Sequence, residues 1–593
     1  MNMSDNARFA SEWIQAWNAH DLEAILEHYD ESIVFTSPFV QQWGDQNDGT
    51  LKGKAALRLY FDSALKRFDN LHFELISVFS GAQSVVLYYR SVSGLFCAET
   101  TLDPSEWESA RALGHRVIDD AIDFLAGARE RPVWSPIPEA CKAVFREPLP
   151  TQPMSAELVY ESFRKNILPY STGNIHPRFF AWVLGTGTVT GALADLLASV
   201  MNPNVTIGDH SPMYVDGQVI DWCKEMLGFP ATAGGLLVSG ATMANLTALT
   251  VARFKVLEPL KEQGVFGMPG PMVAYGSSET HACVSKAVQV LGLGAEGFCI
   301  LPVDAHYRIR PNDLREKIRS DRAQGKIPFC IVANAGTVNT GAIDPLQELW
   351  EIAREENLWL HIDGAFGAMA KLTPAFAESL KVIERADSLA FDLHKWLYMP
   401  YEVGCVLIRD AALQRRTFAS AANYLLAHDR GLAGGPETIS NKGIELSRGF
   451  KALKVWMSLK EHGIDKYRRQ ISRNIAQAMY LGELIRKSPE LELLADVSMN
   501  IVCYRYTPHQ LPSPDRNEFD DLNEFDNLNA FNKELLMQLH ESGKAAPSYT
   551  LLNGQYAIRA AITNHRTRLA DMDILVEATI EIGRRLIGRK LTH

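Results

Sequence analysis

The stretch Leu358-Trp-Leu-His-Ile-Asp-Gly-Ala365 combines a largely apolar run with a carboxylate at its end. Short apolar runs of this kind are typical of strands that are buried on both faces of a parallel sheet. Ligands bind in the crevice at the carboxyl ends of such strands, so we expect Asp363 to face a binding site. A turn aspartate that caps the next element is the alternative. Ala365, two residues further on, leaves room for a flat ring against the backbone.

Short apolar runs alternate with helical patterns between Ser155 and Leu459. Strands separated by helices indicate a mostly parallel α/β sheet. A long helical pattern follows Gly463, and two strand patterns around a further helix predict a smaller C-terminal α/β domain. The predicted strands are Gly235–Val238, Met272–Tyr275, Phe329–Ala333, Leu358–Ile362, Ser388–Phe391 and Gly404–Ile408, then Ile501–Tyr506 and Gln555–Ile562 in the small domain.

The first 95 residues have a different pattern, in which amphipathic helices precede half-buried strands. The predicted helices are 7–29 and Lys54–Phe68, and the predicted strands are Ile33–Phe35, Leu71–Phe79 and Ser84–Ser93. This order is similar to that of the SnoaL-like cone domain, in a shortened form. We therefore expect a small α+β domain that serves as a packing module or an oligomer contact.

The composition argues against several classes of protein. Lys and Arg number 59 and Asp and Glu number 70, so the net charge is −11, which is unfavourable for nucleic-acid binding. The eight cysteines show no C-x-x-C spacing, which predicts no metal site and a reduced, cytoplasmic protein. The charge-free stretch Met226–Ala252 contains Pro230 and a Gly-Gly pair, so we expect a loop and a buried helix there, not a membrane span. The polar start, Met1–Arg8, predicts no signal peptide.

Lys395 lies in Asp392-Leu-His-Lys-Trp396, directly after the predicted strand Ser388–Phe391. Burial lowers the pKa of a lysine and yields the neutral amine that a Schiff base requires. An interfacial lysine that extends from the core to solvent is the alternative. Asp363 favours the Schiff-base interpretation of Lys395. A carboxylate that faces a pyridine nitrogen keeps that nitrogen protonated and makes the ring an electron sink.

Two further motifs fit the same chemistry. Ser239-Gly-Ala-Thr-Met-Ala-Asn245 joins a strand to a helix, and small residues at a helix N-terminus expose the N–H groups that hold a phosphate. Thr242 adds a hydroxyl donor. His281 begins a helix, where its imidazole could stack on a ring or could simply cap the helix. The order of phosphate loop, histidine, strand-end aspartate and lysine predicts one composite site.

These residues resemble the group II pyridoxal-phosphate-dependent decarboxylases, and the closest branch is the aromatic-L-amino-acid decarboxylases. The resemblance extends from Thr101 to the end of the chain. It implies a fold-type-I architecture and a homodimer with the active site at the interface. The matching segments are His176-Pro-Arg-Phe-Phe180, Ser211-Pro-Met213, Ser239-Gly-Ala-Thr242, Thr280-His281, Gly336-Thr337, Gly341-Ala-Ile-Asp344, His361-Ile-Asp-Gly-Ala365 and Asp392-Leu-His-Lys-Trp396.

The expected organisation has four parts. Residues 1–95 form the SnoaL-like α+β domain, and residues 96–175 form a helical connector that contacts the dimer partner. Residues 176–460 form the large domain that binds pyridoxal phosphate. Residues 461–593 form the small C-terminal domain.

The resemblance implies a role for each candidate side chain. Lys395 forms the Schiff base with pyridoxal phosphate, Asp363 pairs with the pyridine nitrogen, and His281 stacks on the ring. Tyr424, in Ala421-Ala-Asn-Tyr-Leu425, corresponds to a loop tyrosine that protonates the carbanionic carbon of a quinonoid intermediate after CO₂ leaves. Further cofactor contacts are implied for Gly240, Ala241, Thr242, Thr337, Ala365, Asp392 and His394, and substrate contacts for Trp182, Val183 and Tyr401.

The implied reaction is decarboxylation of an aromatic L-amino acid to its amine. The nearest alternative is an aldehyde synthase, which adds an oxidative deamination with O₂. Plant aldehyde synthases typically carry Phe at the tyrosine position and insect ones Asn at the histidine position, so Tyr424 and His281 favour the amine. Arg559 raises the alternative of a carboxylate-retaining aminotransferase, although the resemblance implies a structural arginine there. A non-catalytic scaffold is the last alternative, and the intact Lys395 and Asp363 argue against it.

This sequence departs from the family pattern at three positions. Val338 stands where many relatives carry a second threonine, Phe366 replaces a common tyrosine, and Asp392 replaces an asparagine found in some animal members. Each departure changes a polar group in the predicted cofactor site.

Overall fold

The structure is a computed structural model of the 593-residue chain. It describes residues 3–37, 40, 50–67, 71–80, 85–91, 102–104, 106–260, 262–419, 428–508 and 524–590. The chain divides into two compact units, Met1–Gly114 and His115–His593.

The first unit contains helices and two short antiparallel sheets. A single predicted helix over residues 7–29 is wrong, because the chain breaks at Asn18 and restarts where the Asp21 side chain accepts the N–H of Ala24 as an N-cap. Its core combines aliphatic side chains with aromatic ones, among them Trp17 and Phe61. The elements are α1 (Met3–Asn18), α2 (Leu22–Glu27), β1 (Val34–Thr36) paired with β2 (Thr50–Lys52), α4 (Lys54–Arg67), and β3 (Phe73–Ser80) paired with β4 (Val85–Ser91).

The large sheet of the second unit has seven strands in the order β6-β12-β11-β10-β9-β7-β8. All neighbours are parallel except β12, which runs antiparallel to both β11 and β6. This topology confirms the predicted mostly parallel α/β domain. The strands are β6 (Gly234–Val238), β7 (Met272–Ser277), β8 (Phe298–Leu301), β9 (Ile327–Asn334), β10 (Trp359–Asp363), β11 (Ser388–Asp392) and β12 (Gly404–Ile408).

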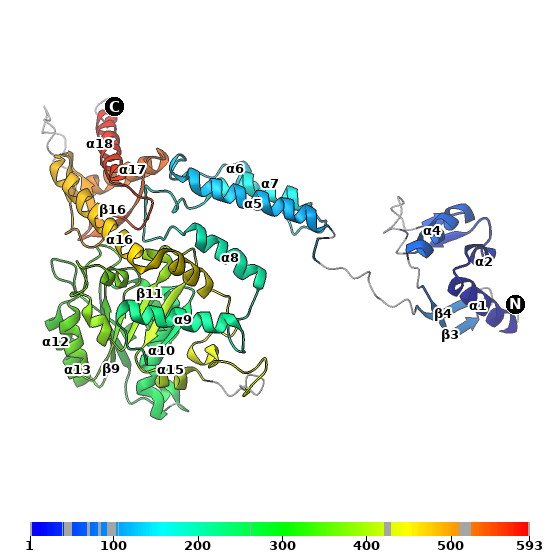
Figure 1. The fold of residues 1–593 in the computed structure, drawn as a ribbon, viewed down its shortest axis with the longest axis horizontal. Helices are drawn as coiled ribbons and strands as arrows, with labels where there is room; N and C mark the ends of the chain where they lie inside the picture. The colour runs from blue at the N-terminus through cyan, green and yellow to red at the C-terminus, as the bar shows by residue number, and fades with distance from the viewer. Residues whose placement is uncertain are drawn as a thin grey trace. The chain divides into compact units, whose positions relative to one another are not determined.

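Helices cover this sheet because their apolar faces pack on the buried strands. Helix α10 (Ala241–Leu257) packs across β12, β11, β10 and β9, and α12 and α13 pack against β9 (Figure 1). The other helices of the large domain are α8 (Val189–Met201), α9 (Ser211–Leu227), α11 (Ala282–Val290), α12 (Pro311–Ala323), α13 (Leu346–Glu355), α14 (Leu393–Trp396) and α15 (Ala411–Phe418).

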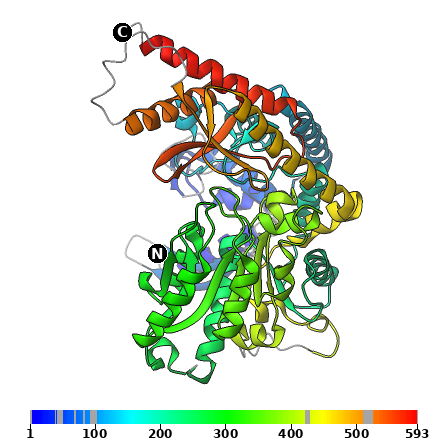
Figure 2. The same ribbon diagram turned by 90° about the vertical axis from the view of Figure 1, so that its left-hand side faces the viewer.

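The small domain, orange and red in Figure 2, lies at one end of the large domain and has a five-stranded sheet in the order β13-β14-β16-β15-β5. Strand β5 is only Phe179–Phe180, and it pairs with β15 although it lies far upstream in the chain. The remaining strands and helices are β13 (Leu491–Leu493), β14 (Ile501–Tyr506), β15 (Ala546–Leu552), β16 (Gln555–Ala561), α16 (Ala452–Lys487), α17 (Glu524–Glu541) and α18 (Ala570–Lys590).

The connector helices are α5 (Trp107–Ala126), α6 (Glu139–Val144) and α7 (Ala156–Asn166). Arg129, just after α5, donates to the buried carboxylate of Asp571 at 2.7 Å and thereby ties the connector to the start of α18. A buried carboxylate of this kind requires its charged partner, so this ion pair fixes the connector on the small domain.

Candidate active site

A cavity of about 560 Å³ lies where the large sheet meets strands β15 and β16 of the small domain. Twelve of the fourteen site residues predicted from the sequence line it. They are Trp182, Val183, Gly240, Ala241, Thr242, His281, Asp363, Ala365, Asp392, His394, Lys395 and Tyr401. Segments that are far apart in the sequence therefore converge on one space.

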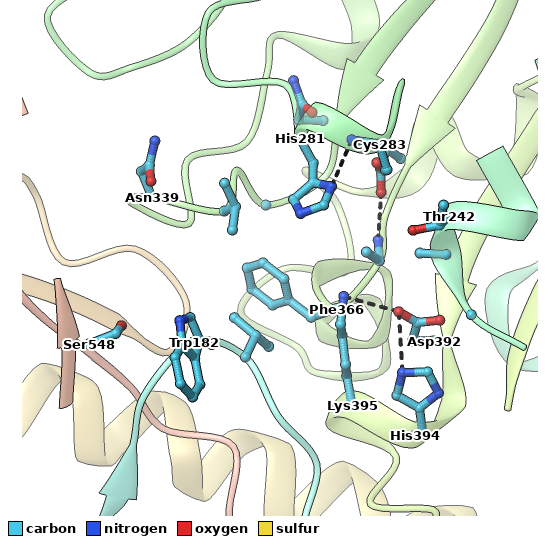
Figure 3. A pocket seen from close by; sticks show the side chains of 18 of the residues that line it. Trp182, Thr242, His281, Cys283, Asn339, Phe366, Asp392, His394, Lys395 and Ser548 are labelled. Atoms are coloured by element: carbon cyan, nitrogen blue, oxygen red, sulfur yellow. Dashed lines mark hydrogen bonds and ion pairs between the residues drawn. The ribbon is translucent and has the colours of Figure 1, made fainter. Parts of the chain in front are cut away.

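Lys395 lies in the short helix α14, immediately after the end of β11. Its Nζ forms an ion pair with Oδ2 of Asp392 at 3.0 Å, and Figure 3 shows its side chain directed at that carboxylate. Asp392 is buried, and its Oδ1 has no hydrogen-bond partner among the described residues. The site therefore holds the Lys395 amine together with an acceptor atom, Asp392 Oδ1, that is available to a hydrogen-bond donor of a ligand.

His394 lies beside the same carboxylate. Its Nδ1 accepts the N–H of Val403 at 3.1 Å, which leaves Nε2 to face Asp392 at 3.6 Å. Burial lowers the pKa of His394 below its usual range, so the ring is neutral at pH 7. The Tyr401 ring packs 4.3 Å from the His394 ring, centroid to centroid, and burial raises the pKa of Tyr401 to about 12.

The N-terminus of α10 provides an anion site. Gly240 is its N-cap, and no side chain caps the first N–H groups of the helix. A Cβ at position 240 would lie 3.3 Å from His394 Cε1 and 3.6 Å from Asp392 Oδ1, so a side chain would fill the space in front of these groups. The uncapped amides, the Thr242 hydroxyl and the His394 ring form a donor set suited to a phosphate.

Asp363 ends β10, as the sequence predicts. One carboxylate oxygen accepts the N–H of Ala365 at 3.0 Å, and the other accepts Nδ2 of Asn245 at 2.8 Å. Both contacts are N–H donors, so each carboxylate oxygen accepts one hydrogen bond from the protein. A carboxylate held in this way fits the ring nitrogen of a pyridine.

His281 caps a helix and also faces the cavity. It is the N-cap of α11, where its Nδ1 accepts the N–H of Cys283 at 3.2 Å, and its ring also lines the cavity. Burial raises the pKa of the Cys283 thiol to about 11, so this neighbour stays protonated at neutral pH.

One described residue among those predicted, Thr337, does not line the cavity. The Thr337 hydroxyl lies within a turn, where it accepts the N–H of Ala342 at 3.1 Å and contacts Thr340, while its neighbour Val338 lines the cavity instead. Tyr424 lies outside the described residues.

Arg559, on β16, is a cavity residue whose position the sequence did not reveal. Its Nε donates to the carbonyl of Asn339 at 3.0 Å, and its Nη1 donates to the carbonyl of Trp182 at 2.8 Å. Its Nη2 is buried without a hydrogen-bond partner among the described residues, and burial lowers the pKa of this guanidinium to about 10. These bonds support the predicted structural role, because they tie β16 to two walls of the cavity.

Asn245 is the last residue of the motif Ser239–Asn245, and its side chain contacts Asp363. The motif does not predict this contact. Asn339, Ser548 and Tyr549 also line the cavity. The last two come from β15, and strand alternation alone does not show which distant site a small-domain strand faces.

No helix in the described part of the chain is long and apolar enough to cross a membrane. Within the same residues, His, Cys, Asp and Glu form no group that could hold a metal ion.

The donor set at α10, the lysine and the strand-end carboxylate together fit a phosphorylated pyridine aldehyde, and so define an α/β enzyme that works through pyridoxal phosphate. Residues 138–507 match the pyridoxal-dependent decarboxylase conserved domain, and residues 10–117 match the SnoaL-like domain. The chain belongs to the pyridoxal-dependent decarboxylase family. The predicted cofactor and the predicted carboxy-lyase class are thereby confirmed.

Relatives of more than one activity resemble the chain. It is 37% identical to an aromatic-L-amino-acid decarboxylase of Bacillus atrophaeus, over 78% of this chain and 93% of that one. It is 29% identical to a phenylacetaldehyde synthase of Petunia hybrida, over 79% and 92% of the two chains. The structure of Catharanthus roseus tryptophan decarboxylase with L-tryptophan has a TM-score of 0.72 and 26% identity, and covers 82% of this chain and 100% of that chain.

Proposed function

We propose that this protein converts an aromatic L-amino acid to its amine and CO₂. The observation that carries the proposal is that Lys395 shares one cavity with the apolar and aromatic side chains of Trp182, Val338 and Phe366. Such side chains suit an aromatic ring better than a charged side chain. The identity to the Bacillus atrophaeus decarboxylase supports the same substrate class.

We assign the cofactor contacts residue by residue. Lys395 would bind the aldehyde carbon, Asp363 the ring nitrogen, and His281 the ring face. The amides at Gly240–Thr242, with His394, would hold the phosphate. When bound, pyridoxal phosphate supplies a protonated ring that accepts the electron pair left by the departing CO₂.

The protein groups would perform the remaining work. Asp363, which receives two N–H donors, holds the proton on the ring nitrogen. The apolar part of the cavity lining would also favour loss of the substrate carboxylate as CO₂, because the charge is dispersed in the transition state. Tyr424 would then deliver a proton to the α-carbon.

An aldehyde synthase is the second candidate, because a phenylacetaldehyde synthase is among the relatives. Tyr424 and His281 favour the amine product by the family pattern described above. The amine is therefore the proposed product.

We also propose a homodimer. No residue of α7 is buried, and its Leu158 and Val159 side chains are 60% and 54% exposed. On α8, Val200 and Met201 are 76% and 52% exposed. Exposed apolar helices of this kind are typical of protein contacts, and light scattering should give twice the mass of one chain. A fully active monomer would contradict the proposal.

A cytoplasmic location is supported by the cysteines. The seven that the structure describes are all unpaired. Unpaired cysteines in a long chain are typical of a reducing compartment.

The substrate proposal is tested by mass spectrometry of products. The protein loaded with pyridoxal phosphate is incubated with L-tyrosine, L-DOPA, L-tryptophan, L-phenylalanine and L-glutamate. Lys395→Ala is the blank, and Lys381→Ala, which removes an ion pair outside the cavity, is the matched control. We expect an amine from an aromatic substrate with the parent and the control but not with the blank. Turnover of L-glutamate alone, or an aldehyde product, would overturn the proposal.

A further inference from the structure

We propose that a relay of four buried side chains fixes the orientation of the Asp363 carboxylate. The relay runs from Trp359 through Ser388 and His361 to Asn245. These are positioning residues that act through Asp363, and the inference rests on the role proposed above for Asp363.

The relay is continuous. Trp359 Nε1 lies 2.7 Å from Ser388 Oγ, and the same oxygen lies 2.8 Å from His361 Nδ1. His361 Nε2 lies 2.7 Å from Asn245 Oδ1, whose Nδ2 lies 2.8 Å from Asp363 Oδ2.

Elementary chemistry fixes the direction of every bond. A carboxylate only accepts, so Asn245 must present Nδ2 to Asp363, and its Oδ1 must then accept a proton from His361 Nε2. At the other end an indole only donates, so Ser388 Oγ accepts from Trp359. The serine hydroxyl proton is therefore left for His361 Nδ1. Burial favours the neutral His361 ring, which has one N–H, on Nε2, and the relay then has a single proton arrangement.

The relay is buried, so water cannot reach its polar atoms and form hydrogen bonds in place of the relay residues. Asn245, His361 and Ser388 are 0% exposed. Their placement follows from the sheet, because His361 on β10 and Ser388 on β11 are register partners. Buried polar groups of this kind are expensive to leave unpaired, so each bond holds its neighbour in place.

The consequence concerns the geometry of Asp363. The relay donates to Oδ2, and the N–H of Ala365 donates to Oδ1. These two contacts lock the plane of the carboxylate and direct its remaining lone pairs. A rigid acceptor holds a ring proton better than one that must reorient.

The relay itself can be tested without substrate. Long-range ¹H–¹⁵N NMR of apoprotein labelled at histidine, assigned with His361→Gln, reads which ring nitrogen carries the proton. We expect His361 to be protonated on Nε2 alone, and Ser388→Ala to shift the Nδ1 signal. A proton on Nδ1, or a mixture of both forms in the parent, would overturn the proposal whether or not the proposed function is correct.

The effect on the site is tested with Ser388→Ala and with the conservative variant Ser388→Thr. The control is Ser458→Ala, which changes a buried serine on α16 outside the cavity. We expect Ser388→Ala to change the visible absorption of the bound cofactor and to lower kcat about tenfold, with KM changed less than about twofold. Ser388→Thr should restore both, and Ser458→Ala should alter neither. A parent-like spectrum and kcat in Ser388→Ala would contradict the relay. Trp359→Phe, which removes the donor at the far end, provides a second variant with the same expected direction if Ser388→Ala does not fold.

Discussion

Lys395 and Asp392 form an ion pair with 3.0 Å between Nζ and Oδ2, inside the cavity that the first residues of α10 also line. The second oxygen of Asp392 is buried without a hydrogen-bond partner among the described residues. Lys395 is therefore the nearest partner of this carboxylate, and His394 Nε2 lies further away at 3.6 Å. Any chemistry that uses the lysine amine removes the nearest partner of this carboxylate and leaves only the contact with His394.

The first prediction follows from that dependence. Asp392→Asn removes a negative charge beside the proposed phosphate site, and it removes a buried carboxylate that would lose its lysine partner in the loaded protein. Both effects favour the dianionic cofactor, so the Kd for pyridoxal phosphate should fall on the order of tenfold. Titration of apoprotein with the cofactor measures it. Asp387→Asn, a buried carboxylate outside the cavity that pairs with Arg354, is the matched control. Weaker binding to Asp392→Asn would contradict this account.

The second prediction concerns Tyr424. Phenylalanine at this position cannot deliver a proton to the α-carbon, so Tyr424→Phe should shift the product from amine toward aldehyde. The ratio of the two is measured by mass spectrometry. Tyr214→Phe, an exposed tyrosine outside the cavity, should give amine as the parent does. An unchanged amine yield from Tyr424→Phe would remove the assigned role.

The third prediction separates the structural and clamp roles of Arg559. Two different nitrogens of the Arg559 guanidinium reach the carbonyls of Asn339 and Trp182, and lysine has only one nitrogen, so Arg559→Lys should lower the free energy of unfolding by about 1–3 kcal/mol. KM should rise because one cavity wall loosens. Arg505→Lys, which changes an ion pair with Glu492 on the neighbouring strands, is the control. A loss of kcat/KM of about 100-fold or more with unchanged stability would instead indicate a carboxylate clamp.

The fourth prediction concerns stability in acid. Burial lowers the pKa of His361 to about 4, whereas an unfolded histidine has a pKa of about 6.5. Above pH 6.5 both states are neutral, so this histidine adds no pH dependence there. As the pH falls from 6.5 toward 4, only the unfolded chain gains the proton, and the free energy of unfolding decreases by an amount on the order of 3 kcal/mol.

Urea unfolding at pH 7 and at pH 5 measures this dependence. His361→Gln should reduce the difference between the two pH values but not abolish it, because burial also lowers the pKa of His176 and of His565 to about 4. His306→Gln, which changes an exposed histidine, should preserve the parental difference. The same difference in His361→Gln as in the parent would show that His361 is not neutral in the folded protein.

The sequence could predict the parts of the site that lie at strand ends and helix starts. Asp363 and Lys395 follow buried apolar runs, and Gly240 directly precedes a helix. In each case one local sequence pattern predicts both the strand or helix and the place of the residue at its end. Short apolar runs likewise predicted six of the seven strands of the large sheet, and β8 (Phe298–Leu301) is the one that they did not indicate.

The remainder depends on contacts between distant segments. Strand β5 has two residues and pairs with β15 across most of the chain, which no local pattern shows. The Thr337 hydroxyl lies within a turn because the chain returns at Ala342, whose N–H donates to it. The side chain of Asn245 meets Asp363 only because α10 packs across β10.

One measurement tests the central claim most directly. With the preferred aromatic substrate, CO₂, amine and dissolved O₂ are followed in the same reaction, with Lys395→Ala as the blank. The account predicts one amine for each CO₂, no uptake of O₂, and neither product from the blank. Aldehyde and ammonia formed with consumption of O₂ would contradict it and would make the protein an aldehyde synthase.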